Sequence, residues 1–183
     1  MKTILYTLAL FSFIANSQCI KGDCQNGKGT YKYVNGGTFV GMFKNGDEFK
    51  GVFTNIFPSG PIVFDGYFID TENGPTLDST KKGKMIHYAN IEKEGFITQV
   101  VENNMISWKL NGVGEKKSLS NSGGFFIEKG NFINDILNDE KGIIIYPSGN
   151  KYLGGVVNGK RQGVGKVITP DGGIQQDGNW YED

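Results

Sequence analysis

The single histidine, His87, limits the metal and acid–base chemistry that this sequence can support. One imidazole cannot form a multi-histidine metal site or a pair of histidines that act as acid and base. A cysteine–histidine nucleophile pair would need Cys19 or Cys24, but both lie near the N-terminus and can instead pair with each other. The chain also lacks a Gly-x-Ser-x-Gly motif and a Walker-type phosphate loop. We therefore expect His87 to be an ordinary strand residue.

The acidic run from Asn134 to Glu140 is the other place where side chains could do chemistry. Asp135, Asp139 and Glu140 could supply two carboxylates for glycoside hydrolysis or oxygen ligands for calcium. A hydrolase would need one of them to meet another carboxylate inside a pocket. The run also falls where the repeat described below places a hairpin tip, and polar residues are common in such turns. We expect no catalytic residue, metal or cofactor here.

Composition disfavours a nucleic-acid partner. Lysine plus arginine and aspartate plus glutamate number 19 each, so the chain has no net charge to draw it to a polyanion. The basic groups at Lys81–Lys84 and Lys160–Arg161 contain too few charges to hold a phospholipid surface strongly. Glycine is abundant at 28 residues without a collagen period, which indicates many turns and close backbone contacts.

The first 17 residues have the layout of a secretory signal peptide. Lys2 precedes an apolar run from Ile4 to Ile14, and small residues follow up to Ser17. The apolar run is too short to span a bilayer. We expect cleavage after Ser17 and export to the periplasm, the cell envelope or the medium of a bacterial cell.

The mature chain would then consist of residues 18–183 and carry both cysteines into an oxidising compartment. Gln18 precedes Cys19 where a lipoprotein signal needs glycine or alanine, so we expect no N-terminal lipid. A disulfide between Cys19 and Cys24 and a pair of free thiols both remain open, because a separation of five residues does not decide between them.

The stretch from Tyr152 to Gly172 indicates how the rest of the chain is organised. Asn158-Gly159 accepts the positive φ angles of a two-residue hairpin turn, and β-branched residues flank it on both sides. Pro170-Asp171-Gly172 then marks the turn to the next strand. This stretch therefore predicts one β-hairpin plus a connection.

Copies of this unit recur through the chain, each with a glycine two residues before an apolar residue. The successive spacings of these glycines are 25, 29, 35, 24 and 24 residues, and they are Gly41, Gly66, Gly95, Gly130, Gly154 and Gly178. The second strands of the predicted hairpins also have a glycine two residues before an apolar residue, as at Gly165 before Val167. The period of about 24 residues predicts an all-β chain: an antiparallel meander of about a dozen strands.

The unit resembles the membrane occupation and recognition nexus (MORN) repeat, whose pattern runs Tyr-x-Gly-x-aromatic, Asn-Gly, Gly-x-Gly-x-aromatic, Asp/Asn-Gly. Residues 152–172 match nearly throughout, although Val156 and Val167 replace aromatics, and residues 22–60 and 177–181 also fit. The middle, about 71–123, diverges. The resemblance implies an elongated, twisted sheet of stacked hairpins over residues 18–183, with a loop or short helical turn at residues 71–82.

The residues two beyond the repeat glycines should share one face of the sheet, because side chains alternate along a strand. This apolar row consists of Phe43, Phe68, Ile97, Phe132, Val156 and Trp180. Half of the residues two before the same glycines are polar, so we expect that preceding row to be less buried. Phe132→Ala should then destabilise the fold by more than about 2 kcal/mol and Glu128→Ala by less than about 0.5 kcal/mol.

Three functions follow from these expectations. The resemblance implies a non-enzymatic binding or scaffold module whose partner is a protein or a membrane surface, with phospholipid contact known in some members. A carbohydrate-binding sheet is the alternative, because rows of aromatic rings can stack on sugars. A hydrolase or a hydrolase accessory is the least favoured function.

Overall fold

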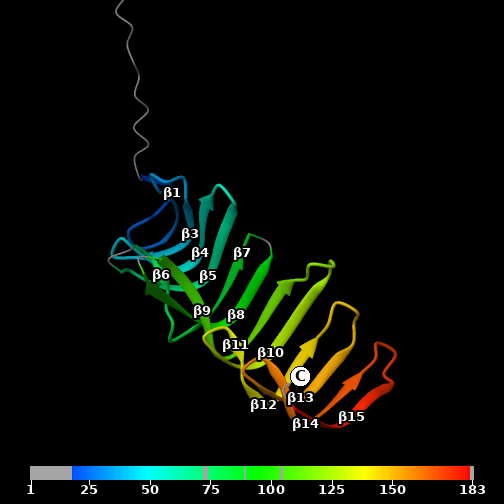
Figure 1. Cartoon of the computed structure of the whole chain (residues 1–183). Coiled ribbons are helices and arrows are strands. Elements are labelled where there is room, and N and C mark those ends of the chain that lie inside the picture. The colour runs from blue at the N-terminus through cyan, green and yellow to red at the C-terminus, as the bar shows by residue number, and fades with distance from the viewer. Residues whose placement is uncertain (1–17, 72–73, 89, 104, 182–183) are drawn as a thin grey trace, which may run out of the picture.

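The computed structural model describes residues 18–71, 74–88, 90–103 and 105–181, and these ranges form one antiparallel sheet without a helix (Figure 1). The strands of the main path follow in chain order, each hydrogen-bonded to the next, while β6 and β11 lie off this path and pair with β5 and β10. The predicted all-β meander is confirmed. The predicted signal peptide, residues 1–17, lies outside the described residues.

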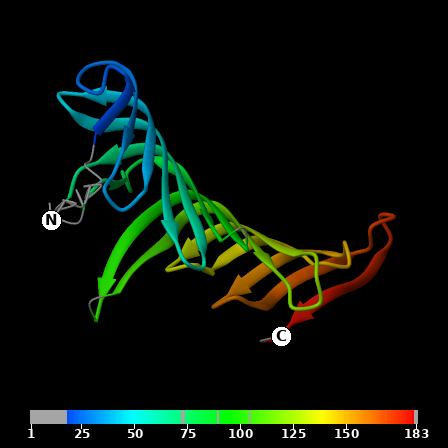
Figure 2. The same cartoon turned by 90° about the horizontal axis from the view of Figure 1, so that it is seen from above.

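The strand bounds are as follows: β1 Gln18–Gly22, β2 Lys28–Lys32, β3 Thr38–Lys44, β4 Asp47–Phe57, β5 Gly60–Ile69, β6 Thr76–Leu77, β7 Lys82–His87, β8 Ile91–Glu102, β9 Met105–Leu119, β10 Phe125–Ile133, β11 Ile136–Leu137, β12 Asp139–Ile145, β13 Lys151–Val157, β14 Lys160–Ile168 and β15 Ile174–Trp180. Seen from above, the strand direction turns steadily from the N-terminal to the C-terminal end, so the sheet is strongly twisted (Figure 2).

A row of glycines crosses the sheet, with one glycine from every strand of the main path. In the strand register, every one of these glycines is paired directly with a glycine of at least one neighbouring strand. The row consists of Gly22, Gly29, Gly41, Gly51, Gly66, Gly83, Gly95, Gly114, Gly130, Gly142, Gly154, Gly165 and Gly178. We call the face toward which their missing side chains would point the inner face, and the opposite one the outer face.

Bulky side chains lie over neighbouring pairs of these glycines, in the space that a Cβ would fill. All are buried, with exposed fractions of 0–3%. They are Phe39, Leu77, Leu110, Leu137 and Tyr152. Glycine is a poor strand residue on its own, but the cover of an apolar side chain compensates by burying the exposed backbone.

In the divergent middle of the chain, side chains from other positions lie over the glycine pairs. Phe39 and Tyr152 stand two residues before a repeat glycine, but the corresponding position in β8 is Lys93. The cover there comes instead from leucines on the returning strand of each hairpin, which pair as Phe68 with Leu77, Ile97 with Leu110, and Phe132 with Leu137. The hairpin ends therefore fold back over the inner face, and the spacings of 29 and 35 residues reflect longer ends.

Five of the six repeat glycines share an unusual backbone conformation. Gly66, Gly95, Gly130, Gly154 and Gly178 have φ angles between +144° and +159°, a region that other residues rarely adopt. The strands bend at these glycines, which lets the hairpin ends turn over the inner face. Since Gly95 belongs to the divergent middle, the geometry that it shares with the other four supports the register read from the sequence.

The expectation for residues 71–82 is only partly right. The segment departs from the meander, but its described part contains the short strand β6 rather than a helical turn, because Leu77 and Thr76 pair with Phe68 and Ile69. Two-residue turns form at Asn45-Gly46 and Asn158-Gly159, as their positive φ angles require.

The apolar row beyond the glycines is buried, with exposed fractions of 1–5%, and joins a single core. The preceding row was expected to be less buried, and this is wrong at Phe39, Phe64, Lys93 and Tyr152, which are also buried. Both rows lie on the inner face, so the folded hairpin ends cover both.

At the N-terminal end, Cys19 and Cys24 are joined by a disulfide, with the sulfurs 2.08 Å apart. Among the described residues there is no helix with the length and apolar character that a membrane crossing requires.

Candidate functional site

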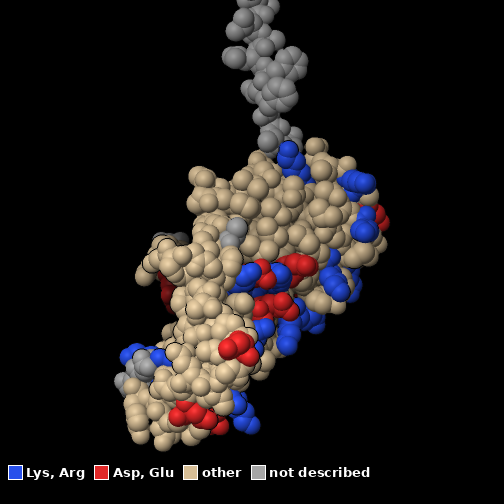
Figure 3. Space-filling model, turned by 90° about the vertical axis from the view of Figure 1, so that its right-hand side faces the viewer, with Lys and Arg blue, Asp and Glu red and all other residues tan. Residues whose placement is uncertain are grey.

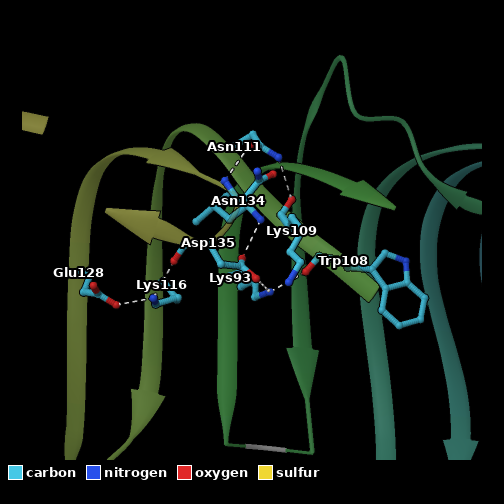
Figure 4. Close-up of polar contacts among 9 residues, drawn as sticks. Lys93, Trp108, Lys109, Asn111, Lys116, Glu128, Asn134 and Asp135 are labelled. Atoms are coloured by element: carbon cyan, nitrogen blue, oxygen red, sulfur yellow. Dashed lines mark hydrogen bonds and ion pairs between the residues drawn. The ribbon is translucent and has the colours of Figure 1, made fainter. Parts of the chain in front are cut away.

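The hairpin formed by β8 and β9 is longer than any other and extends across the inner face. Its outer part, residues 98–103 and 105–109, pairs only within the hairpin, and we call it the arm. Trp108 on the arm packs against Phe64 of β5 with ring centroids 4.9 Å apart. The arm therefore crosses over β7 to reach β5, and Figure 4 shows it running across the strands of the main sheet.

A cleft of about 330 Å³ lies between the arm and the sheet. Met85 and His87 of β7 and Ile91 and Lys93 of β8 line it from the sheet side, whereas Ile106, Ser107, Trp108 and Lys109 line it from the arm. Asp135, from the turn between β10 and β11, completes its lining. We call this hollow the arm cleft.

Lys93 lies at the polar end of the arm cleft, with only 8% of its side chain exposed. Its Nζ donates to Oδ2 of Asp135 at 2.7 Å and to the carbonyl oxygen of Trp108 at 2.6 Å (Figure 4). The other Asp135 oxygen, Oδ1, accepts from the backbone N–H of Leu110 at 2.7 Å, and the Asp135 N–H donates to the carbonyl of Leu110. These contacts satisfy backbone groups of Trp108 and Leu110 at the base of the arm, on the edge of β9 that does not pair with β8.

A second lysine continues the cluster toward the C-terminal half. Lys116 Nζ donates to the carbonyl oxygen of Asp135 at 2.8 Å and lies 2.6 Å from Oε2 of Glu128. Lys93, Lys116 and Glu128 are cross-strand neighbours in a row whose other members are mostly apolar. The middle of the inner face thus has a buried polar cluster between two apolar regions.

Burial shapes the ionisation of two groups in the arm cleft. Burial lowers the pKa of Lys93 and the neighbouring lysines lower it further, while the hydrogen bond and charge of Asp135 oppose the change. Burial also lowers the pKa of His87, with a smaller contribution from the charge of Lys93. The imidazole is therefore neutral at pH 7 and can act as an acceptor or a neutral donor.

Two further hollows, of about 370 and 270 Å³, lie toward the C-terminal end and share Tyr146 and Arg161 in their linings. Phe126 lies edge-on to Tyr146, with centroids 5.9 Å apart, and both rings are half-buried. The Arg161 guanidinium lies 4.0 Å above the Trp180 ring. Half-exposed rings and hollows therefore extend along the inner face on both sides of the polar cluster.

Two of the three candidate catalytic carboxylates, those of Asp135 and Asp139, are engaged in contacts with a lysine and with backbone N–H groups. The Asp135 carboxylate accepts from Lys93 Nζ and from the backbone N–H of Leu110 rather than meeting a second carboxylate. Asp139 and Glu140 line a hollow of about 510 Å³, but Asp139 accepts the backbone N–H groups of Asn131 and Lys141 with its two oxygens. Within the described ranges no group of three or more His, Cys, Asp and Glu side chains is placed to hold a metal ion.

His87 was expected to be an ordinary strand residue, and the structure places it in the lining of the arm cleft, with its ring 3.8 Å from that of Tyr88. Lys93 and Lys116 were not predicted from the sequence as site residues. The signal for Lys93 was a polar residue two before a repeat glycine, where other repeats have an aromatic ring, whereas Lys116, two residues after Gly114, carried no such signal. The acidic run was correctly placed at a hairpin tip, since Asn134 and Asp135 form the turn between β10 and β11.

The outer face carries a different kind of surface. Figure 3 shows acidic and basic side chains gathered together over the middle of one side of the molecule, with few charges above them. On the outer face of β7–β10, Lys84 pairs with Glu92 at 2.7 Å and Lys129 with Glu115 at 2.7 Å. Charges of both signs lie there, so this region presents no single-sign field.

A family model describes two parts of this chain. The model of the MORN repeat matches residues 25–38, from the β1–β2 connection through β2 to the start of β3, and residues 152–174, from β13 through β14 to the start of β15. Among curated proteins, none matches the chain in sequence. The two matches show MORN repeats at both ends of the sheet, and MORN repeats are generally involved in binding proteins or membranes.

Proposed function

We propose that this MORN-repeat protein is an exported, non-enzymatic binding module that holds another protein along the inner face of its sheet. The observation that carries the proposal is the set of half-exposed rings and hollows on that face, from the arm cleft to Tyr146 and Arg161. Protein partners are anchored by aromatic and arginine side chains in such pockets.

A protein partner is favoured over a membrane surface by the distribution of charge. The chain has 19 basic and 19 acidic residues, and on the outer face Lys84 and Lys129 are each paired with a glutamate. Binding to anionic lipid needs clusters of unpaired basic residues. The larger apolar and aromatic features lie on the inner face, where a folded partner or an extended segment can bury them.

Export is the part of the proposal that rests on sequence, through the layout of residues 1–17. The Cys19–Cys24 disulfide is consistent with an oxidising compartment. Sequencing the N-terminus of protein purified from its native source should give Gln18 as the first residue. A mature protein that starts before Ala15 would contradict export by cleavage at this site.

Binding through the inner face can be tested with a matched pair of variants on neighbouring strands. Phe126→Glu places a charge in the half-buried inner-face ring pair, whereas Val113→Glu places one on the outer face, where Val113 is 60% exposed. The mature chain and both variants would be immobilised and exposed to the envelope fraction of the source cell. We expect one partner to be retained by the mature chain and by Val113→Glu but lost from Phe126→Glu.

Two readouts complete this test. Circular dichroism must show that both variants keep the β spectrum of the parent chain, so that loss of binding reports the surface and not unfolding. Flotation with vesicles that contain phosphatidylserine should leave the protein in the unbound fraction. Equal retention of the partner by all three chains, or flotation without any protein partner, would contradict the inner-face proposal.

Carbohydrate binding is a second candidate, favoured by one observation. The smallest of the C-terminal hollows combines the Tyr146 ring with the planar amides of Asn150, Gln175 and Gln176, and Asn150 already donates to Gln175 at 3.0 Å. Rings and planar polar groups together suit the two faces and the hydroxyls of a sugar. Specific glycan-array binding that is lost in Gln176→Ala would favour this function over protein binding.

A further inference from the structure

We infer that the arm cleft is a binding site for a carboxylate attached to an apolar group, as at the C-terminus of a peptide chain. This inference rests on the proposed function in one respect: a protein partner would bring its own C-terminal carboxylate to the inner face. The site itself follows from the contacts, walls and charge of the arm cleft.

The walls of the arm cleft are mostly apolar and come from two layers. Met85 and Ile91 line it from the sheet, and Ile106 and Trp108 line it from the arm. Met85 is buried, while Ile106 remains 43% exposed at the mouth. An apolar group that enters the cleft would bury Ile106 and cover the Trp108 ring, which contributes the hydrophobic part of the binding free energy.

The polar end of the cleft has a donor that is only partly used. A lysine ammonium has three N–H donors. Two of the Lys93 donors reach Asp135 Oδ2 at 2.7 Å and the Trp108 carbonyl at 2.6 Å. Among the described residues the third has no acceptor, so it is available to a ligand in the cleft that Lys93 lines. The neutral His87 ring and the hydroxyl of Ser107, also in the lining, can supply further hydrogen bonds to an oxyanion.

The charges that line the arm cleft leave one positive charge in excess. Lys93 and Lys109 are opposed by a single carboxylate, that of Asp135. A bound anion would therefore neutralise the excess positive charge, whereas a cation would be repelled by two ammonium groups. The burial of Lys93 strengthens the preference, because the charge of a side chain that is only 8% exposed is less screened by solvent.

The size of the cleft limits the ligand. At about 330 Å³ it lies near the lower end of the range for small-molecule pockets. It can take the last one or two residues of a chain or a short fatty acid, but not a folded surface. The shared chemistry of the two sources is a carboxylate with an adjacent apolar group.

The fluorescence of Trp108 offers a direct measurement. The chain has two tryptophans, so Trp180→Phe leaves Trp108 as the single emitter. Three probes would be titrated into the mature Trp180→Phe chain at pH 7: acetyl-Gly-Gly-Leu with a free carboxylate, the same peptide as its C-terminal amide, and octanoate. We expect saturable binding of the free-acid peptide and at least about tenfold weaker binding of the amide.

Variants locate the binding within the cleft. Lys109→Gln should weaken binding of the free-acid peptide at least about threefold, because it removes the excess positive charge. Ile106→Glu should weaken binding of the same peptide at least about tenfold, because it places a carboxylate at the mouth of the cleft. Lys117→Gln is the control, because Lys117 lies on the outer face over the Phe125 ring, and it should leave the affinity within about twofold. Lys93 is not replaced, because it is needed for the fold.

Each outcome decides the inference. Equal affinity for the free acid and the amide, or no fluorescence response to any probe up to about 10 mM, would contradict a carboxylate-binding site in the arm cleft. Binding of octanoate but not of the peptide would contradict a peptide C-terminus as the ligand and would identify a fatty-acid site. If the partner captured in the previous experiment binds unchanged after removal of its last residue, the peptide source fails while the proposed function stands.

Discussion

Lys93 Nζ lies 2.7 Å from Asp135 Oδ2, although the two residues are 42 positions apart in the chain. The contact joins β8 to the turn between β10 and β11. The same two side chains also bind the carbonyl of Trp108 and the N–H of Leu110, so a single ion pair holds the turn, the arm and the main sheet together. The position of the arm cleft therefore depends on this pair.

Replacing Asp135 with asparagine should destabilise the fold by about 2–4 kcal/mol at pH 7, because it leaves a buried lysine without its counter-charge. Asparagine tolerates the positive φ of 73° at this turn position, so the backbone should not add to the cost. The control is Glu115→Gln, which breaks the exposed Lys129 pair and should cost less than about 0.5 kcal/mol. Urea unfolding measures both, and similar costs would show that Lys93 does not need Asp135.

The same variant should also change how stability depends on pH. Burial holds the pKa of Lys93 in the folded state below the unfolded value of 10.5. Between those two values the unfolded chain binds more protons, so Lys93 makes stability rise as the pH increases. Without Asp135, which opposes the lowering, the folded pKa falls further and the rise begins at a lower pH. Asp135→Asn should therefore recover part of its lost stability between about pH 7 and pH 10 relative to the parent chain.

The repeat could be predicted from sequence because its signals are local. Asn158-Gly159 sets a turn and the glycine two before an apolar residue sets the register, so the strand order and the buried row from Phe43 to Trp180 follow. The polar cluster could not be predicted, because Lys93 and Asp135 meet only after the β8–β9 hairpin bends at Gly95 and folds over the sheet. Long-range contacts of this kind leave no periodic pattern in the sequence.

Tyr33 should make the fold less stable at alkaline pH. Burial raises its pKa, and the hydrogen bond to Glu48 and the charge of that carboxylate raise it further. A raised pKa means that the unfolded chain loses the proton first, so stability falls as the pH rises above the unfolded value of 10.0. The ring is only half-buried, so solvent screening limits the effect to at most about 1 kcal/mol between pH 10 and pH 11.

The comparison is with Tyr33→Phe, which keeps the ring contact with Phe53 but cannot ionise. Its unfolding free energy should fall less steeply above pH 10 than that of the parent chain. Parallel curves for the two proteins would show that Tyr33 does not titrate differently in the folded state.

Phe132→Ala should destabilise the fold by about 3–5 kcal/mol, because the ring is 1% exposed and the folded hairpin end cannot collapse into the space. Glu128, the control expected from the sequence, is ion-paired with Lys116 at 2.6 Å, so its truncation is not neutral. The adjacent Ile133 is 51% exposed, and Ile133→Thr keeps the branched side chain that suits a strand. That control should stay within about 0.5 kcal/mol in urea unfolding. Equal costs at positions 132 and 133 would contradict the assignment of faces.

The cover of glycine pairs by single side chains can be tested at Gly165 and Tyr152. A Cβ added at Gly165 would overlap the Tyr152 hydroxyl oxygen and lie 2.6 Å from two ring carbons, so Gly165→Ala should cost about 1–3 kcal/mol by overpacking. Tyr152→Ala should cost about 3–5 kcal/mol by leaving a cavity. In the double variant the new methyl group occupies part of that cavity.

The double variant should therefore be more stable than the sum of the two single costs predicts, with a coupling energy of about 1–2 kcal/mol. Gly165→Ala combined with Leu77→Ala is the control, because Leu77 covers Gly66 and Gly83, far along the sheet. Those two costs should add to within about 0.5 kcal/mol. Additive costs for Gly165 and Tyr152 as well would mean that the tyrosine ring does not occupy the space above the glycine, and the role of glycine in this repeat would need another explanation.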